Sequence, residues 1–487
     1  MTRVSALLAL AGLALAQDPA SRPQVSPLFE TADGSRFLLV PTGGPPLVHW
    51  VWLTPAGVLE EPPGLEGVTH ALARAAMTGT TAACSKDPEQ EQIALDLLDR
   101  VERAAASVAM SGEVMSTDLR TRLERARRQA QDLHDRGAFA RELAQVPIVS
   151  VRLSEHPEAD LVEIAAATEG IERLARLLHA WREGRILRGV HEHLHALRTA
   201  ALARRVEGPL ATADEEILTH HFAGHPYARF FAAGSPLTVP LTQTQALNLW
   251  QQTHAPRRGC HVLVGGFDPV AVRTVLANVF ASSALPRERA PRPAVPRDTK
   301  VARRSTIPGG REARLLMTWR LPRVLPDSHL TGLQDWLLGD EEAFLPRGLR
   351  TKGHPHVRVS GMLPYPGTRG DGLLRLEAMA DPDEAGAVLA VDQVLLVLAG
   401  LLVSAATDGP SAADLARIRA RASARAVELA QDPAARARML ALRLGLSGDE
   451  PEQALDPAPP DAATLRVLLQ AILQRGTPAV VTLEAAR

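Results

Sequence analysis

Two short stretches of the chain place histidines where a metal could be held on one face of a helix. The stretch GVTHALARAAMTGT, residues 67–80, has the apolar spacing of an amphipathic helix and carries His70. The motif HEHLH places His191 and His195 one helical turn apart, with Glu192 beside them. Two imidazoles at this spacing can hold zinc while a carboxylate acts as general base for a bound water. The HEHLH stretch is therefore a candidate site for metal-dependent hydrolysis, and His70 is a single candidate ligand on the other helix.

The first stretch resembles the metal-binding helix of a known peptidase family. In the inverted motif His-x-x-Glu-His the three residues share one helix face, so the two histidines bind zinc and the glutamate activates water. This motif marks the insulinase, pitrilysin and mitochondrial-processing-peptidase family, the M16-type metallopeptidases. His70 falls at the first ligand position, and framework positions of the motif are matched by Gly67, Leu72, Gly79 and Thr80.

The other positions of that zinc site are changed. The catalytic glutamate position is Ala73, and the second histidine position is Arg74. The third ligand of the family falls on Ala200 or Ala201, neither of which can bind a metal. A catalytic zinc needs three protein ligands, but only His70 remains here. Arg74 also places a permanent positive charge beside it. The resemblance therefore implies a catalytically inactive homologue without a zinc cofactor.

Later landmarks of the same family are retained. Residues 225–227 read His-Pro-Tyr, and CHVLVGGFDP, residues 260–269, resembles the strand and turn that follow this motif. The segment FLPRGLRTKGHPHVRVSG resembles the one that carries an arginine and a tyrosine that bind the substrate carbonyl. Arg350 falls at the arginine position, and the tyrosine position falls on His356, or on Val357 if the gap is placed otherwise. The resemblance covers essentially the whole mature chain and implies a substrate contact at Arg350.

The HEHLH motif offers a competing metal site, because it has the ordinary zincin spacing His-Glu-x-x-His. In this alternative, zinc bound by His191 and His195 with Glu192 would make the chain a metallopeptidase. Against it, no third histidine or Gly-rich turn follows at zincin spacing, and 16 histidines in the chain raise the chance of an accidental match. The sequence therefore favours the interpretation that HEHLH lies on a partly exposed helix face and binds no metal.

Charge and targeting features restrict the partners. The 54 Lys and Arg residues against 55 Asp and Glu give a formal net charge of −1, so no global field favours nucleic acid or anionic lipid. Arg3, an apolar run from Val4 to Leu15 and an Ala-x-Ala site at residues 14–16 predict a signal peptide over residues 1–16. No later segment reaches about 18 uninterrupted apolar residues, so no membrane span is expected. We expect an exported protein, periplasmic or extracellular.

Cys84 and Cys260 are too few for a disulfide framework in so long a chain. The sequence leaves open a single bridge between them, and it favours two small buried thiols.

The first half of the mature chain reads as an α/β unit. Residues 36–40 and 47–53 look like paired strands, and residues 64–78 have the spacing of a helix. From about 89 to 145 the pattern is almost wholly helical and charged, and it resembles a helical insertion seen in some bacterial members of the family. We predict an N-terminal peptidase-like domain over residues 26–285.

A proline-rich linker, PRERAPRPAVPRDTK at residues 286–300, separates this unit from a C-terminal peptidase-like domain at 301–487. There LLMTWRLPR (315–323) resembles LVHWVWLTP (47–55), which indicates an internal repeat. The repeat and the resemblance imply an α+β (or α/β) fold of the mitochondrial-processing-peptidase type. Its two homologous halves would each be an antiparallel-rich sheet with helices packed on one face, clasped around a cavity.

The resemblance also implies a function for a member that lacks the zinc motif. Such members commonly pair with an active one, and the inert subunit contributes cavity wall and substrate grip. The leading interpretation is therefore an exported, non-catalytic subunit of a zinc peptidase heterodimer. Its partners would be an active peptidase subunit of the same family and a peptide or unfolded polypeptide. The alternative is a stand-alone peptide- or protein-binding scaffold of the cell envelope.

Overall fold

A computed structural model describes most of the chain. The described residues are 27–77, 84–135, 137–182, 190, 193–194, 196–197, 199–200, 203, 208–229, 241–254, 258–281, 303–310, 312–322, 325–367, 372–380, 390–447, 459–475 and 478–485. The predicted signal peptide and the predicted linker lie outside them.

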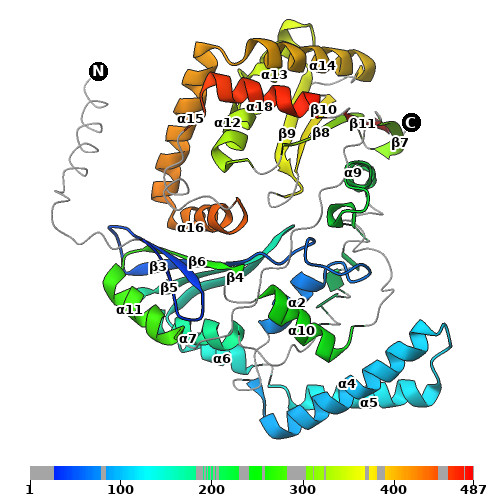
Figure 1. Ribbon diagram of the computed structural model, residues 1–487, viewed down its shortest axis with the longest axis vertical. Helices are drawn as coiled ribbons and strands as arrows, with labels where there is room; N and C mark the ends of the chain where they lie inside the picture. Colours follow the sequence, from blue (N-terminus) through cyan, green and yellow to red (C-terminus); the bar gives the residue numbers. More distant parts are fainter. Residues whose placement is uncertain are drawn as a thin grey trace.

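Two sheets with the same strand order form the centres of the two halves (Figure 1). The first has the order β1-β2-β6-β3-β5-β4 and is built from β1 (Leu28–Glu30), β2 (Arg36–Pro41), β3 (Leu47–Thr54), β4 (Ile148–His156), β5 (Ala159–Ala167) and β6 (Cys260–Gly265). The second has the order β7-β11-β8-β10-β9 and is built from β7 (Arg303–Gly310), β8 (Arg314–Arg320), β9 (Val357–Tyr365), β10 (Leu373–Ala380) and β11 (Ala479–Ala485).

Without the short β1, the two strand orders coincide element by element. The pairs β2·β6 and β7·β11 are parallel, and the other pairs in both sheets are antiparallel. This shared topology confirms the predicted α+β architecture of two homologous, antiparallel-rich halves.

One prediction about the first sheet is wrong. Strands β2 and β3 are not paired, because β6 lies between them, parallel to β2 and antiparallel to β3. All six residues of β6 are buried, and a strand buried along its whole length needs a neighbour on both sides. The strand nearest in sequence therefore gives way to one about two hundred residues further along.

Alternate residues of the first sheet face two different layers, as strand geometry requires. Trp50 and Trp52 of β3 belong to a core shared with helices on one face. These helices are α2 (Val68–Ala76), α7 (Ile171–Arg182), α10 (Gln243–Thr253) and α11 (Pro269–Val279). The predicted helical insertion comprises α4 (Pro88–Met110), α5 (Thr117–Leu133) and α6 (Ala138–Ala144), and the α4–α5 hairpin projects from the lower right of Figure 1.

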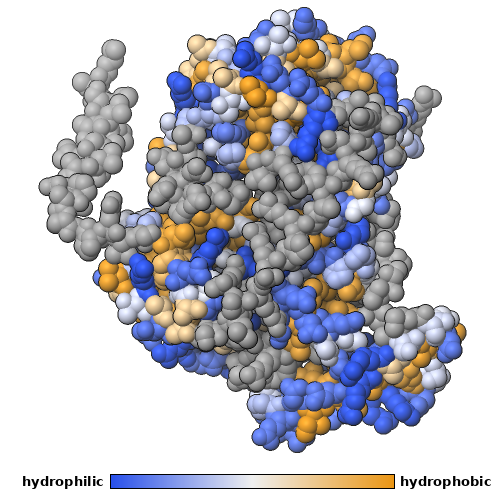
Figure 2. Space-filling model, in the orientation of Figure 1, coloured by the Kyte–Doolittle hydropathy of each residue, from blue (hydrophilic) through white to orange (hydrophobic). Residues whose placement is uncertain are grey.

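The second sheet is covered in the same manner. Met317 and Trp319 of β8 share a core with α12 (Asp327–Leu338), α13 (Phe344–Thr351), α14 (Val391–Asp408), α15 (Ala412–Gln431) and α18 (Ala462–Gln474). Among the described helices, α14 is long and apolar enough to cross a membrane by length and composition. It packs against α13 and α18, and 28% of it is buried. Figure 2 shows hydrophobic residues reaching the surface over this end of the molecule, where Leu396 and Val403 are exposed.

Two helices join the halves by packing on the sheet of the opposite half. Helix α16 (Pro433–Leu442), followed by η5 (Arg443–Ser447), packs on β3 and β6 of the first sheet. Helix α9 (Pro209–His221), followed by η2 (Pro226–Arg229), packs on β7 and β11 of the second sheet. The remaining short helix, η1 (Thr168–Gly170), leads into α7. Cys84 and Cys260 are two buried thiols and form no disulfide with each other, as the sequence favoured.

Candidate functional site around helix α2

Helix α2 begins at a glycine whose backbone another residue would adopt only with strain. Gly67 precedes the helix with φ of 86° in the left-handed region. Val68, Leu72 and Ala75 pack into the core of the first half. The helix thereby directs His70 toward the hairpin formed by β4 and β5, and Arg74, one turn later, reaches the same hairpin.

His70 forms a largely buried ion pair with Asp160, near the start of β5. Its Nδ1 lies 2.6 Å from Oδ1 of Asp160, and the two side chains are 16% and 3% exposed. Burial alone would lower the pKa of His70, but Asp160, with smaller contributions from Glu61 and Glu155, raises it to about 9. Burial raises the pKa of Asp160 to about 6, against the lowering effect of His70. At neutral pH both side chains are therefore charged.

Arg74 forms the second ion pair with the same hairpin. Its Nε and Nη2 lie 2.7 and 2.5 Å from Oε1 of Glu155 in β4, and the side chains are 42% and 31% exposed. Between the two cations on this helix lies Ala73, which is 3% exposed and carries no acid–base group. The position where the inverted motif has its general base is thus an apolar contact.

His254, at the end of α10, lies behind Asp160. Its Nε2 is 3.9 Å from Oδ2 of Asp160, and neither atom has a hydrogen-bond partner among the described residues. Burial, together with the nearby Arg258, lowers the pKa of His254 to about 3, so the ring is neutral, and it stacks on Trp250 at 3.6 Å.

This donor set does not fit zinc. Tetrahedral zinc at roughly 2.1 Å from each ligand places ligand atoms about 3.4 Å apart. The imidazole of His70 is instead in direct contact with Asp160, and the gap from Asp160 to His254 is too long. Across the part of the chain that the structure describes, no group of three or more His, Cys, Asp or Glu side chains could hold a metal ion.

No protein-family model and no curated protein matches the sequence, but solved structures match the fold. A protease from Helicobacter pylori superposes with a TM-score of 0.66 at 13% identity, over 94% of this chain and 98% of that one. An inactive M16 peptidase domain from Pseudomonas fluorescens gives 0.65 at 14% identity, over 94% and 98%. The first half of the periplasmic protease PqqL from Escherichia coli gives 0.59 at 14% identity, over 96% and 93%. The chain has the M16-type peptidase fold.

Within this M16-type fold, the third-ligand position lies on a short described part of the chain. Ala200 is helical and exposed, and its methyl group offers no metal ligand. Ala201 lies outside the described residues, as do His191, Glu192 and His195 of HEHLH. The alternative zinc site at HEHLH therefore stays a prediction.

The expected substrate contacts of the M16-type fold lie away from α2. Figure 1 places α13 at the top of the molecule and α2 in its lower half. Arg350, on α13, pairs with Glu342 at 2.6 Å, and the side chains are 35% and 65% exposed. His356 lies in the turn before β9, with its ring 6.2 Å from that of His354. The structure thus does not bring Arg350 and His70 together.

The His-Pro-Tyr landmark of the M16-type fold has a structural role. Tyr227 is fully buried, and its hydroxyl donates a hydrogen bond to Glu158 in the β4–β5 turn. The backbone N–H of Tyr227 donates to Nδ1 of His225 at 3.2 Å. The landmark thereby ties the end of α9 to the hairpin that also receives the ion pairs of α2.

Sequence reasoning missed the anionic side of the site around α2. Glu155 and Asp160 flank the turn of the stretch SEHPEAD, where acidic residues border a buried strand. That pattern could have drawn attention to the hairpin, because a buried carboxylate requires a partner. His254 carries no comparable signal, since only the packing of α10 brings it to Asp160.

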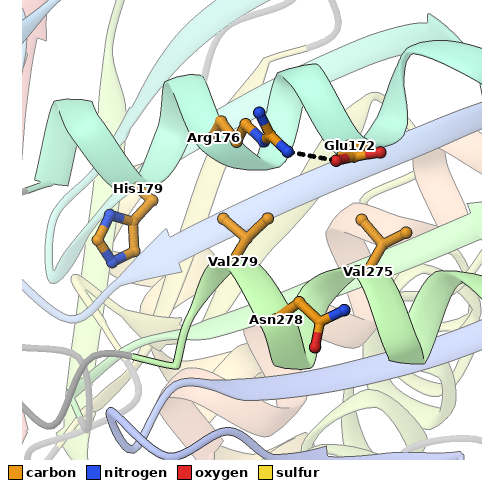
Figure 3. Close-up of a pocket in the computed structure, with 6 residues that line it drawn as sticks. All are labelled: Glu172, Arg176, His179, Val275, Asn278 and Val279. Carbon is orange, nitrogen blue, oxygen red and sulfur yellow. Dashed lines mark hydrogen bonds and ion pairs between the residues drawn. The ribbon is translucent and has the colours of Figure 1, made fainter.

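A separate surface pocket of about 450 Å³ lies between α7 and α11 (Figure 3) and is lined by Glu172, Arg176, His179, Val275, Asn278 and Val279. Arg176 and Glu172 pair at 2.5 Å, so their charges neutralise each other. The pocket shares no residue with the site around α2.

Proposed function

We propose that this chain is an exported, catalytically inactive M16-type homologue that serves as the non-catalytic subunit of a zinc peptidase heterodimer. In that role it helps to enclose and grip a peptide or unfolded polypeptide. Ala73 supports this proposal most directly, because a general base typically supplies roughly 10² to 10⁴ in rate and its position here holds a buried methyl group. The ion pairs of His70 and Arg74 occupy the rest of the site.

The peptide would lie along β4. This strand is the outer strand of the first sheet, and a free strand edge can pair with an extended peptide. The register shift between Ile148 and Ser150 leaves Val149 as an extra residue, 72% exposed, at the start of the strand. The ordered pairing from Ser150 to His156 would then support the peptide beside α2.

Export and partnership rest on the sequence and on the comparisons together. The N-terminal segment has the pattern of a signal peptide, and one structural neighbour is described as a periplasmic protease. Another neighbour is described as an inactive M16 domain, which shows that the fold is also used without catalysis. A chain that keeps both halves of the fold and loses the chemistry is well explained if it completes the site of an active relative.

Co-purification from the native host tests this proposal. The tagged chain should recover a zinc-bearing M16-type peptidase that stays bound during gel filtration, because a stable pairing buries well over roughly 1,000 Å². That peptidase should lose turnover when this chain is withheld. If the chain is recovered alone and the relative works equally well without it, the heterodimer is wrong and the stand-alone scaffold takes its place.

Metal analysis of the same preparation tests the absence of catalysis. Protein purified without chelator should hold no stoichiometric zinc and should not cleave unstructured peptides. About one zinc per chain, with chelator-sensitive cleavage, would contradict the proposal. In that case His191→Ala, in the HEHLH motif, should be tested before His70→Ala.

A further inference from the structure

Two carboxylates on the β4–β5 hairpin face each other directly. Glu155 of β4 and Asp160 of β5 are register partners, so their side chains lie on the same face of the sheet. Like charges directly opposite on adjacent strands destabilise the pairing. The hairpin therefore needs positive charge at this point.

Helix α2 supplies that charge from two side chains one turn apart. His70 pairs with Asp160 at 2.6 Å, and Arg74 pairs with Glu155 at 2.5 Å. Each cation thus neutralises one member of the carboxylate pair. Because residues four apart lie on one helix face, the two bonds hold the helix to both strands of the hairpin at once.

We infer that His70 and Arg74 together replace the charge and the cross-linking of a bound dication, so that α2 is locked to the β4–β5 hairpin without a metal. Two monovalent cations and two carboxylates give a neutral set. A dication at the same place would have to displace the guanidinium, which cannot lose its proton. This inference holds whether or not the chain has a peptidase partner.

The surrounding charges do not provide another source of neutralisation. Glu61 accepts hydrogen bonds from the backbone N–H and the hydroxyl of Thr69, and it adds negative charge near His70. His254 is neutral, and Arg258 is paired with Glu60 at 2.8 Å. His70 and Arg74 are thus the described cations in direct contact with the facing carboxylates.

Hydrogen exchange of the full chain, followed by mass spectrometry at residues 68–76 and 148–167, tests whether these two ion pairs hold α2 to the hairpin. Arg74→Gln and Glu155→Gln should each speed exchange of α2 about two- to fivefold, the range for a partly exposed ion pair. In the double variant the fold-increase in exchange rate should be smaller than the product of the two single fold-increases, because the ion pair is broken only once. A chelator should leave exchange of the wild-type helix unchanged.

Arg176→Gln is the matched control, because it removes the same group from an exposed ion pair on α7. It should leave exchange of α2 unchanged. The buried pair gives a second measurement: His70→Gln should speed exchange about tenfold or more, and Asp160→Asn added to it should recover part of the loss. If His70→Gln does not fold, the Arg74 series decides.

Three results would contradict the inference that His70 and Arg74 hold α2 to the hairpin without a metal. The first is faster exchange of wild-type α2 in chelator, which would show that a metal holds the helix. The second is an Arg74→Gln variant that matches Arg176→Gln. The third is a pair of single effects that simply multiply in the double variant.

Discussion

The two halves share a strand order, and each packs an apolar sheet face against a helix of the other half, but the second of these contacts also contains a buried ion-pair network. In the first half, α16 covers an apolar face with Leu440 and Ala441 packed on Leu53 and Val262. In the second half, α9 likewise packs on an apolar cluster, which includes Val481 of β11, and an ion-pair network lies beside it. The same topology thus accommodates the network as an addition to the apolar contact.

The network of the second half is centred on Arg375 of β10. Its guanidinium lies 2.9 Å from Asp214 of α9 and 3.0 Å from Glu377, and it is 6% exposed. His221 of α9 also contacts Thr318 of β8, with Nε2 2.9 Å from Oγ1. An apolar contact tolerates small shifts, whereas a buried ion pair requires one alignment. The ion-pair network therefore adds to the contact of α9 a requirement for alignment that the apolar contact of α16 does not have.

Removing the centre of the network should have the largest effect. Arg375→Leu leaves Asp214 buried without its cation and leaves Glu377 with Arg314 alone, which should lower the free energy of unfolding by about 3–5 kcal/mol. Urea unfolding followed by tryptophan fluorescence measures the loss. Adding Asp214→Leu should restore part of it, because one uncompensated charge is then gone. If the double variant is no more stable than Arg375→Leu, the loss of stability does not come from leaving Asp214 without its cation.

The apolar contact should be somewhat less costly to break. Leu440→Ala should lower the free energy of unfolding by about 2–4 kcal/mol, since the side chain is fully buried against the first sheet. The matched control is Leu396→Ala on α14, where the leucine is 74% exposed and the change should cost less than about 0.5 kcal/mol. Equal losses in the two variants would contradict the role given to α16.

Helices α2 and α9, which both belong to the first half of the chain, should also respond to pH in opposite directions. The pKa of His70 is raised to about 9, so its contribution is complete below the ordinary value of 6.5 and is lost as pH rises through 9. The pKa of His221 is lowered to about 3, by burial and then by His220 and Arg320, so its contribution is lost as pH falls below 6.5.

Exchange protection, corrected for the intrinsic pH dependence, measures both responses. Protection of α2 should fall from pH 6.5 to 9, and protection of α9 should fall on the acidic side. In His70→Gln the alkaline loss at α2 should disappear while the acidic loss at α9 persists. Parallel pH profiles at the two helices would contradict the opposite shifts.

The smallest effect is expected for the proposed substrate contact of the second half. Arg350→Ala should weaken peptide binding about twofold and leave assembly unchanged, because the arginine is already paired with Glu342 near the surface. Fluorescence anisotropy with a labelled peptide measures the change. Glu342→Ala is the control and should strengthen binding slightly if Arg350 reaches the peptide. A large loss in Arg350→Ala would place the peptide on α13 instead of along β4.

Much of the fold could be predicted because it depends on local patterns. Apolar spacing correctly indicated β3 and α2, and the resemblance of residues 260–269 to a strand and turn correctly indicated β6. The resemblance between residues 47–55 and 315–323 correctly indicated two homologous halves. Strands such as β9 were missed, because an outer strand alternates between exposed and buried residues over a short length and contains Pro364 near its end.

The sequence by itself determined which groups the site has lost: a metal ligand and a general base are matters of residue type, and Ala73 and Arg74 supply neither. The tertiary structure decided what took their place. Asp160 and Glu155 reach α2 only because β4 and β5 pair in one register, and β6 separates β2 from β3 only because its buried edges need two neighbours. Such pairings depend on the free energy of the whole packed sheet, which no short stretch of residues encodes.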